Sequence, residues 1–190
     1  MYEQQSHALL NRILDELAPE LQKRDLRHFY TRLGANFYAI YSLFSRLYGG
    51  RDDMEAKLTA LVEVMARKHS ERSGELRTLD MAREADYNWF LSQEWVGMAL
   101  YLDGFAGDLN GLGEHLPYLQ ELGVNLVHVL PIMECPEGAS DGGYAVNNFR
   151  SLKPGAGTLE DLRRLAERMR QRNMLLTLDL VLKHTSDEHP

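Results

Sequence analysis

The chain is poor in cysteine and in long apolar runs. Its single cysteine, Cys135, excludes an internal disulfide framework in the 190 residues and fits a reducing compartment. No apolar run approaches the roughly 18 residues that cross a membrane, and residues 1–5 lack the basic and then apolar pattern of a secretion signal. These absences predict a cytoplasmic protein without a membrane partner.

Positive charge is also in short supply. The chain holds 21 Lys and Arg against 28 Asp and Glu, which gives a formal net charge of -7. Lys and Arg form no basic block, so nucleic acid is not an expected partner. With 44% hydrophobic residues, the chain is long enough for one large or two small domains with a true core. Nothing in the composition indicates an oligomeric state.

Helical periodicity fills residues 1–88. Pro19 interrupts the first apolar stripe and is expected to begin a second helix rather than to lie inside the first. Gly49 and Gly50 are expected to end that second helix. Its aromatic and aliphatic stripe is interpreted as a packing face, because its spacing of three and four suits a bundle core better than an aromatic platform for sugars. The stripe consists of Phe29, Leu33, Phe37, Ile40, Tyr41, Phe44, Leu47 and Tyr48.

Two more helices are predicted before the pattern changes. One begins at Asp52, turns Leu61 and Met65 inward with Met54, Leu58 and Val62, and ends at Ser73. A shorter one covers residues 75–86. We place a domain boundary near residue 90, between an all-helical module over residues 1–90 and an α/β region over residues 91–190.

Short apolar runs alternate with helical patterns in the α/β region. The runs at 96–102, 126–130 and 175–182 lack strict alternation, which is typical of strands buried on both faces of a parallel sheet. The first intervening helix follows a cap at Asp108 and should be kinked or split by Pro117. The second covers residues 158–172, with Thr158 and Asp161 in capping-box positions. This order is the opening of a (β/α) barrel or of a doubly wound sheet.

Three polar residues should lie at the carboxyl ends of these strands, where parallel folds collect ligands: Asp141, Tyr144 and His184. A carboxylate can accept from a sugar hydroxyl, an aromatic ring suits the apolar face of a pyranose, and a neutral imidazole can donate. Each residue also has a structural alternative, as a turn cap, a core anchor and a hydrogen-bonded strand end respectively. Asp179 is expected to be a structural partner, because a carboxylate among Leu and Val must be paired.

A metal site at the end of the chain is not expected. His184, Asp187, Glu188 and His189 gather there, but their spacing does not match a helical His-Glu-x-x-His site. We predict neither a metal nor a cofactor.

The run from Asp179 to His184 resembles the first sequence signature of the α-amylase superfamily, Asp-x-x-x-Asn-His, at the end of barrel strand three. Gly143-Tyr144 with the later Gly157-Thr158 resembles the stretch between strands two and three of the same superfamily. More narrowly, the chain resembles the amylosucrase and sucrose-hydrolase group, which also has a helical amino-terminal module. This narrower resemblance is carried by residues 104–109, 135–138, 140–146 and 184–186.

The resemblance implies a fold and an activity. The fold is an α-helical module followed by the first three strands of an incomplete (β/α)8 TIM barrel. The activity is that of an α-retaining enzyme that uses sucrose, passing glucose to an α-1,4-glucan or to water, so sucrose and α-glucan are the expected ligands. It also implies that Asp141 accepts from a sugar hydroxyl, that Tyr144 stacks on the glucosyl ring, and that His184 hydrogen-bonds it.

One residue departs from the pattern of this group, and the catalytic carboxyl groups of the superfamily come from strands beyond the third. Lys183 stands where the group keeps asparagine, and a lysine cannot act as an oxygen ligand for calcium. If buried there, it would need a carboxylate or a lowered pKa. Retaining glycosidases need two carboxyl groups about 5 to 5.5 Å apart, which in the superfamily come from strands four and five.

The sequence ends at Pro190, just past the third strand, so we expect no catalytic residue in it. We expect it to be the amino-terminal part of a longer enzyme, poorly soluble alone because a barrel has eight strands and about 250 residues. The alternative is a non-catalytic sugar-binding or interaction remnant.

Overall fold

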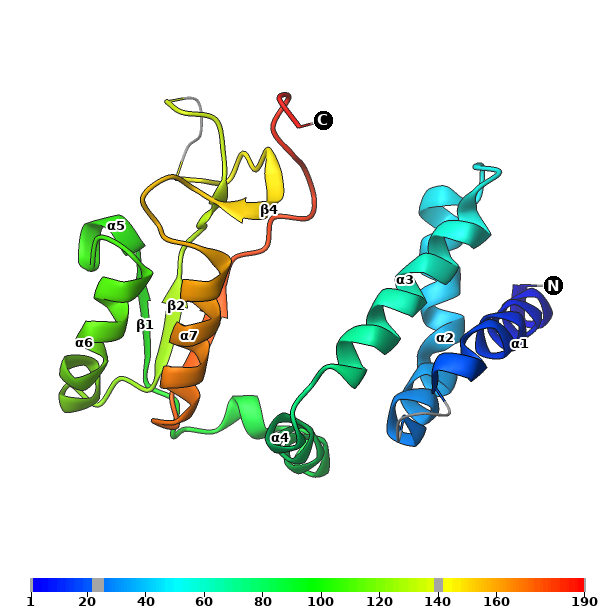
Figure 1. Ribbon diagram of the computed structural model, residues 1–190, viewed down its shortest axis with the longest axis horizontal. Helices are drawn as coiled ribbons and strands as arrows, with labels where there is room; N and C mark the ends of the chain where they lie inside the picture. Colours follow the sequence, from blue (N-terminus) through cyan, green and yellow to red (C-terminus); the bar gives the residue numbers. More distant parts are fainter. Residues whose placement is uncertain (1, 22–25, 139–141, 190) are drawn as a thin grey trace. The chain divides into compact units, whose positions relative to one another are not determined.

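The computed structural model describes residues 2–21, 26–138 and 142–189 (Figure 1). The chain divides into two compact units, Met1–Asp86 and Tyr87–Pro190, each with its own hydrophobic core. None of the described helices is long and apolar enough to cross a membrane.

The first unit is all helical. It consists of α1 (Tyr2–Leu21), α2 (Arg27–Tyr48), α3 (Met54–Ser70) and α4 (Gly74–Ala85). The first half of the aromatic stripe on α2 is buried, which confirms that it is a packing face, whereas Leu47 at its end is 76% exposed. The buried core of the unit comprises Leu9, Leu10, Ile13, Leu26, Phe29, Leu33, Phe37, Tyr41, Leu58, Val62 and Ala66.

Two details of the helical unit differ from the sequence predictions. Helix α1 continues through Pro19 to Leu21, so Pro19 does not begin a second helix. The missing amide hydrogen of a proline removes one internal hydrogen bond, and only two residues of α1 follow Pro19. Leu61 and Met65 on α3 are exposed instead of buried, because the inward face of α3 is formed by Leu58, Val62 and Ala66.

The second unit is built on a parallel sheet. Its strands β1 (Gly97–Leu100), β2 (Leu126–Val129) and β5 (Leu175–Leu178) lie in the order β1-β2-β5. The connections contain α5 (Leu102–Phe105), α6 (Leu109–Glu121) and α7 (Leu159–Arg170), and the 3-10 helix η1 (Trp89–Leu91) precedes β1. The predicted strand-helix-strand alternation is therefore confirmed.

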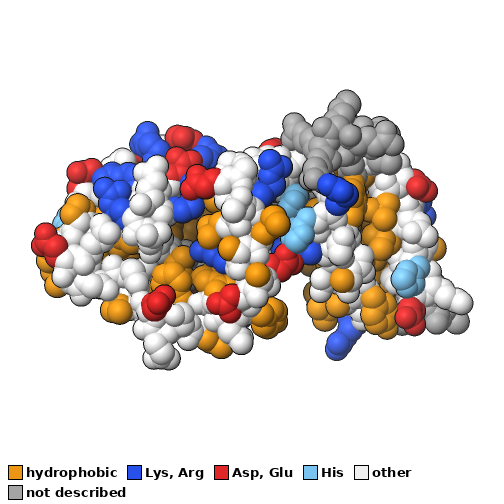
Figure 2. Space-filling model, turned by 90° about the horizontal axis from the view of Figure 1, so that it is seen from below, with side chains coloured by type: hydrophobic (Ala, Val, Ile, Leu, Met, Phe, Trp, Pro, Cys, Tyr) orange, Lys and Arg blue, Asp and Glu red, His pale blue; other side chains and the backbone are white. Residues whose placement is uncertain are grey.

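Helices α6 and α7 pack on one face of this sheet (Figure 1). Val127 and Val129 of β2 point to that face and are fully buried, whereas Ala99 and Thr177 on the opposite face are exposed. The prediction that the strands are buried on both faces is therefore wrong for the described residues, because both helices cover the same side. Hydrophobic side chains also reach the surface of each unit on the face drawn in Figure 2.

A small antiparallel ladder follows β2 and precedes α7 along the chain, and it was not predicted. It pairs β3 (Met133–Glu134) with β4 (Asn148–Leu152). A strand of two residues carries no periodic signal, so only the pairing reveals it. The loop between these strands contains Gly143, whose φ of 88° and close approach to the Pro131 carbonyl exclude a larger residue.

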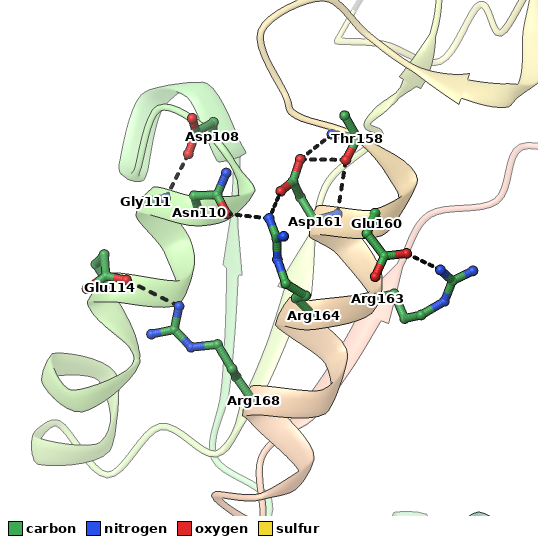
Figure 3. Close-up of polar contacts among 10 residues, drawn as sticks. All are labelled: Asp108, Asn110, Gly111, Glu114, Thr158, Glu160, Asp161, Arg163, Arg164 and Arg168. Atoms are coloured by element: carbon green, nitrogen blue, oxygen red, sulfur yellow. Dashed lines mark hydrogen bonds and ion pairs between the residues drawn. The ribbon is translucent and has the colours of Figure 1, made fainter. Parts of the chain in front are cut away.

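The amino ends of α6 and α7 are capped as predicted (Figure 3). Asp108 accepts from the Gly111 amide at 2.7 Å. Thr158 and Asp161 form a complete capping box, in which the Asp161 carboxylate accepts from the Thr158 amide at 2.7 Å. These bonds satisfy amide groups that a helix leaves unpaired at its start.

Helix α6 runs unbroken through Pro117, so the predicted split does not occur. A proline cannot donate to the carbonyl four residues earlier, here that of Gly113. Arg168 of α7 donates to this carbonyl instead, with an Nη2 to O distance of 2.7 Å. Its Nη1 also reaches Glu114 at 3.2 Å, the contact drawn in Figure 3. The neighbouring helix therefore satisfies the group that Pro117 leaves without its internal donor.

Candidate functional site

Two of the three predicted site residues lie together beyond the carboxyl end of the sheet. Tyr144 lies in the connection between β3 and β4, and His184 lies in the segment after β5. The His184 Nε2 is 3.1 Å from the backbone oxygen of Tyr144, so the two segments are in direct contact. Asp141, the third predicted residue, lies outside the described residues.

Asp179 joins this pair to the sheet. It directly follows β5, and its Oδ2 accepts a hydrogen bond from the Tyr144 hydroxyl at 3.0 Å. Its Oδ1 is 2.9 Å from Nε2 of His128, which lies in β2. The prediction that Asp179 must be paired is confirmed, and the pairing links residues from β2, β5 and the Tyr144 loop.

The Tyr144 side chain is anchored at its hydroxyl and remains open along its ring. It is 40% exposed, which excludes the alternative of an anchor with its ring in the core. The hydrogen bond to Asp179 is the main cause that raises the pKa of the Tyr144 phenol above its usual value, followed by partial desolvation and the negative charge of Asp179. The phenol therefore stays neutral and donates to the carboxylate.

The segment after β5 is tied back to the same loop. The Ser186 amide donates to the Val146 carbonyl at 2.9 Å, and Ser186 is buried. An open pocket of about 550 Å³ lies beside this junction, lined by Tyr144 and residues 179–184. Lys183 lines it with an exposed side chain, so it does not need the buried carboxylate partner that a buried lysine would require.

Sequence reasoning missed His128 and Tyr101. His128 sits in an apolar run, but its register partners Ala99 and Thr177 place it on the face of the sheet that α6 and α7 leave open. This alternation was the available signal, since a histidine among Leu and Val on one face needs a polar partner. The Tyr101 hydroxyl lies 3.0 Å from where a Cβ of Gly142 would be, so Gly142 leaves room for it beside Tyr144.

These residues can bind and orient a ligand, but they form no catalytic pair. Asp179 is the carboxylate at the centre of the described part of the site, and both of its oxygens face partners. No three His, Cys, Asp or Glu side chains gather to hold a metal ion within residues 2–21, 26–138 and 142–189. Tyr144 and His184 line the pocket together with Lys183 and the apolar residues 180–182.

Comparison with known proteins decides the family. The profile described as "Alpha amylase, catalytic domain" matches residues 48–190, which is most of the chain. The chain belongs to the α-amylase family. This α-amylase family member spans about 15% of the length of the curated relatives that it matches.

Several relatives of this α-amylase family member are enzymes named for glucosides. An oligo-1,6-glucosidase from Parageobacillus thermoglucosidasius is 40% identical over 84 residues, covering 44% of this chain and 15% of the relative. A trehalose-6-phosphate hydrolase from Bacillus subtilis is 41% identical over 84 residues, with the same coverage of 44% and 15%. An alpha-glucosidase from Schizosaccharomyces pombe is 44% identical over 87 residues, covering 46% and 14%.

Among solved structures, a mutant isomaltulose synthase from Erwinia rhapontici NX5 in complex with its natural substrate sucrose is similar to this chain. The identity is 37%, the alignment covers 50% of this chain and 18% of the other, and the TM-score is 0.46.

Proposed function

We propose that this chain forms part of the glucosyl-binding wall of an α-retaining, amylosucrase-like enzyme. In this proposal the enzyme takes glucose from sucrose and transfers it to a growing α-1,4-glucan. The observation that carries the proposal is the exposed ring of Tyr144, fixed at its hydroxyl by Asp179 and at its backbone by His184. A ring held in this way offers a flat apolar surface to one face of a pyranose.

The polar groups around Tyr144 supply the directional contacts. His184 donates its Nε2–H to the Tyr144 carbonyl, so a neutral imidazole offers its Nδ1 as an acceptor for a sugar hydroxyl without adding a fixed charge. Asp141 is proposed as a further hydroxyl acceptor, on the resemblance to the amylosucrase group alone. Retention requires a nucleophilic carboxylate and an acid/base carboxyl group, and the proposal assigns neither role to a residue of this chain.

The proposal extends to the fold and its setting. It takes β1, β2 and β5 as the first three strands of a (β/α)8 barrel, supported by their parallel order and by the sheet face that α6 and α7 leave open. Barrel enzymes bind ligands at the carboxyl ends of their strands, where Tyr144 and Asp179 lie. It also takes residues 1–90 as a separate helical module and the cytoplasm as the location.

A second candidate activity is hydrolysis or isomerisation of α-glucosides. It is favoured by the names of relatives at 37 to 44% identity, which include oligo-1,6-glucosidases, an alpha-glucosidase and a palatinase. The Tyr144 and His184 contacts suit this candidate equally, because both reactions begin from the same bound glucosyl unit. The acceptor therefore distinguishes the two activities.

The test is to express the complete reading frame that contains this chain and to supply it with sucrose or with isomaltose. The expected result is release of fructose together with growth of an α-1,4-glucan. Release of glucose and fructose without glucan, or formation of isomaltulose, would support the second candidate and refute transfer. Cleavage of isomaltose alone would do the same. Binding of glucose without turnover of either sugar would instead identify a non-catalytic sugar-binding protein.

A matched pair of variants tests the site itself. Tyr144→Ala should lower kcat/KM for the active substrate at least tenfold, because the stacking surface is lost. Tyr38→Ala removes another exposed tyrosine, 50% accessible and located on α2, and should leave kcat/KM within twofold. Equal effects of the two substitutions would refute the assignment of Tyr144 to the glucosyl wall.

A further inference from the structure

A chain of two hydrogen bonds runs from the middle of the sheet to the hydroxyl of Tyr144. The His128 Nε2 is 2.9 Å from Asp179 Oδ1, and Asp179 Oδ2 is 3.0 Å from the Tyr144 hydroxyl. An ionised carboxylate only accepts hydrogen bonds, so the imidazole and the phenol both donate to it. The pocket beside Tyr144 is lined by Tyr144 and residues 179–184, so His128 does not border the space that a ligand would occupy.

The two bonds together fix the plane of the Asp179 carboxylate. The χ2 torsion of an aspartate has a broad profile, so a hydrogen bond at one oxygen leaves the carboxylate free to turn. A second donor at the other oxygen removes this freedom and directs Oδ2 at the Tyr144 hydroxyl. The Asp179 side chain is 24% exposed, so water would compete for Oδ1 if His128 did not occupy it. Each bond therefore supports the other.

Of these three residues, only His128 lies in a regular strand. It belongs to β2, which is paired with a parallel strand on each side. Its neighbours Val127 and Val129 are fully buried, which anchors this part of the backbone. Asp179 comes after the last residue of β5, and Tyr144 lies in the connection between β3 and β4. His128 is therefore the fixed end of the chain of hydrogen bonds.

The other contacts of Tyr144 do not hold the hydroxyl end of its ring. His184 Nε2 contacts the backbone oxygen of Tyr144, which does not restrain the side-chain torsions. Gly142, which lies beside the ring, presents no side chain to it. Within residues 2–21, 26–138 and 142–189, Asp179 is the only partner of the Tyr144 hydroxyl. The direction of the ring thus depends on the direction of Asp179 Oδ2.

We propose that His128 is a positioning residue of the sugar site, which acts through Asp179 to set the orientation of the Tyr144 ring against the glucosyl unit. This inference rests on the proposed role of Tyr144 in the glucosyl wall. The ring must present its face to a pyranose, so a carboxylate that turns away weakens the stack. Stacking acts on the bound substrate and on the transition state alike, so loss of the orientation raises KM more than it lowers kcat.

The test uses two substitutions at position 128 in the complete reading frame that contains this chain. His128→Leu removes the donor and keeps an apolar side chain, and it should raise KM for the active sugar about fivefold, with kcat within about twofold. His128→Gln keeps an amide N–H with a reach similar to that of Nε2, so KM should stay within about twofold of the wild-type value. An unchanged KM in His128→Leu, or an equal rise in both variants, would overturn the inference.

Circular dichroism checks that each variant folds. If His128→Leu does not fold, His128→Asn replaces it, because its amide is one methylene shorter than that of glutamine and falls short of Asp179. The same rise in KM is expected from it.

A double-mutant cycle separates positioning from a general structural role. In a Tyr144→Ala background the ring that His128 orients is absent, so His128→Leu should change KM by less than about twofold. A further fivefold rise in that background, about the size of the single-variant effect, would show that His128 acts on the site without Tyr144 and would refute the assignment.

Thr177→Val is the matched control on the same face of the sheet. Thr177 is the register partner of His128 in β5, and the substitution replaces a hydroxyl by a methyl group of similar size. KM should stay within about twofold, as for a surface change away from the hydrogen bonds. A rise equal to that of His128→Leu would show that any polar loss on this face disturbs the site, and the specific role of His128 would be lost.

The motion of the Tyr144 ring gives a measurement that does not depend on turnover. Carbon-13 relaxation of the labelled ring should show greater motion in His128→Leu than in the wild type or in His128→Gln. If the complete protein turns over neither sucrose nor isomaltose, the proposed function fails, and the relaxation data still decide whether His128 restrains Tyr144. Equal ring motion in the wild type and in His128→Leu would refute the positioning role, with or without turnover.

Discussion

Arg168 of α7 donates to the backbone carbonyl of Gly113 in α6 at 2.7 Å, which is the carbonyl that Pro117 cannot bond. Gly113 itself permits this approach, because a Cβ there would lie 2.5 Å from Arg168 Nη1. Gly113 is buried, and the carbonyl groups of buried residues are nearly always paired. The contact therefore joins the two helices at a point where α6 lacks an internal hydrogen bond.

Arg168→Ala should lower the free energy of unfolding by about 1–3 kcal/mol, because a buried carbonyl would be left without a donor. Urea unfolding followed by circular dichroism measures this change. Arg163→Ala is the control on the same helix, since Arg163 only pairs with the exposed Glu160 and should cost less than about 0.5 kcal/mol. Equal losses in the two variants would show that the Gly113 contact contributes nothing beyond helix propensity.

A double-mutant cycle isolates the role of Pro117. In a Pro117→Ala background, residue 117 regains an amide that can bond the Gly113 carbonyl, so Arg168→Ala should cost less than about 1 kcal/mol. Additive losses in the double mutant would contradict the assignment of Arg168 as the replacement donor.

Asp179→Asn should lower the pKa of Tyr144 back toward its usual value of about 10. The hydrogen bond from Tyr144 to the Asp179 carboxylate raises that pKa, so it favours the folded state while the phenol is neutral. This contribution to stability is complete below about pH 10 and is lost as the pH rises through the higher pKa of the folded state. NMR of carbon-13-labelled tyrosine across pH 8 to 12 measures the change, and an unaltered titration in Asp179→Asn would refute it.

Asp161 makes the amino end of α7 sensitive to acid. The hydrogen bonds from Thr158 lower the pKa of the Asp161 carboxyl, so its contribution is complete above about pH 4 and is lost as the pH falls through the lower value of the folded state. Helical circular dichroism should therefore decline on acidification, and Asp161→Asn should weaken that dependence. Glu160→Gln, in the same turn but outside the capping box, should leave the acid transition in place.

Lys183→Asn should change the free energy of unfolding by less than about 0.5 kcal/mol, because the lysine side chain is exposed. It should also strengthen binding of the glucosyl ligand about threefold, since an amide can accept from a sugar hydroxyl and an ammonium cannot. Isothermal titration with glucose measures the second effect. Weaker binding in Lys183→Asn would show that the lysine itself donates to the ligand.

Local signals in the sequence were enough for much of the fold. The caps at Asp108 and Thr158 were predictable, because each involves residues only three positions apart. The parallel strands followed from their apolar runs. The open face of the sheet could not be predicted, because apolar composition alone does not say how many faces of a sheet the helices cover.

Long-range contacts were out of reach of such reasoning. His128 meets Asp179 across 51 positions, and Arg168 meets Gly113 across 55. Neither pair has a spacing rule, since each depends on which strands or helices become neighbours in the fold. Tyr144 and His184 were predicted from their place at the strand ends and from the resemblance to a family, but their contact through a backbone oxygen was not predicted.

The contact between Arg168 and α6 also restricts the order in which mutations can accumulate at this interface. Arg168 lowers the cost of proline at position 117, so loss of the arginine should cost less once the proline has been replaced. A side chain at position 113 would displace the guanidinium and leave the carbonyl of residue 113 without a donor. These three positions are therefore expected to co-vary as homologous sequences diverge.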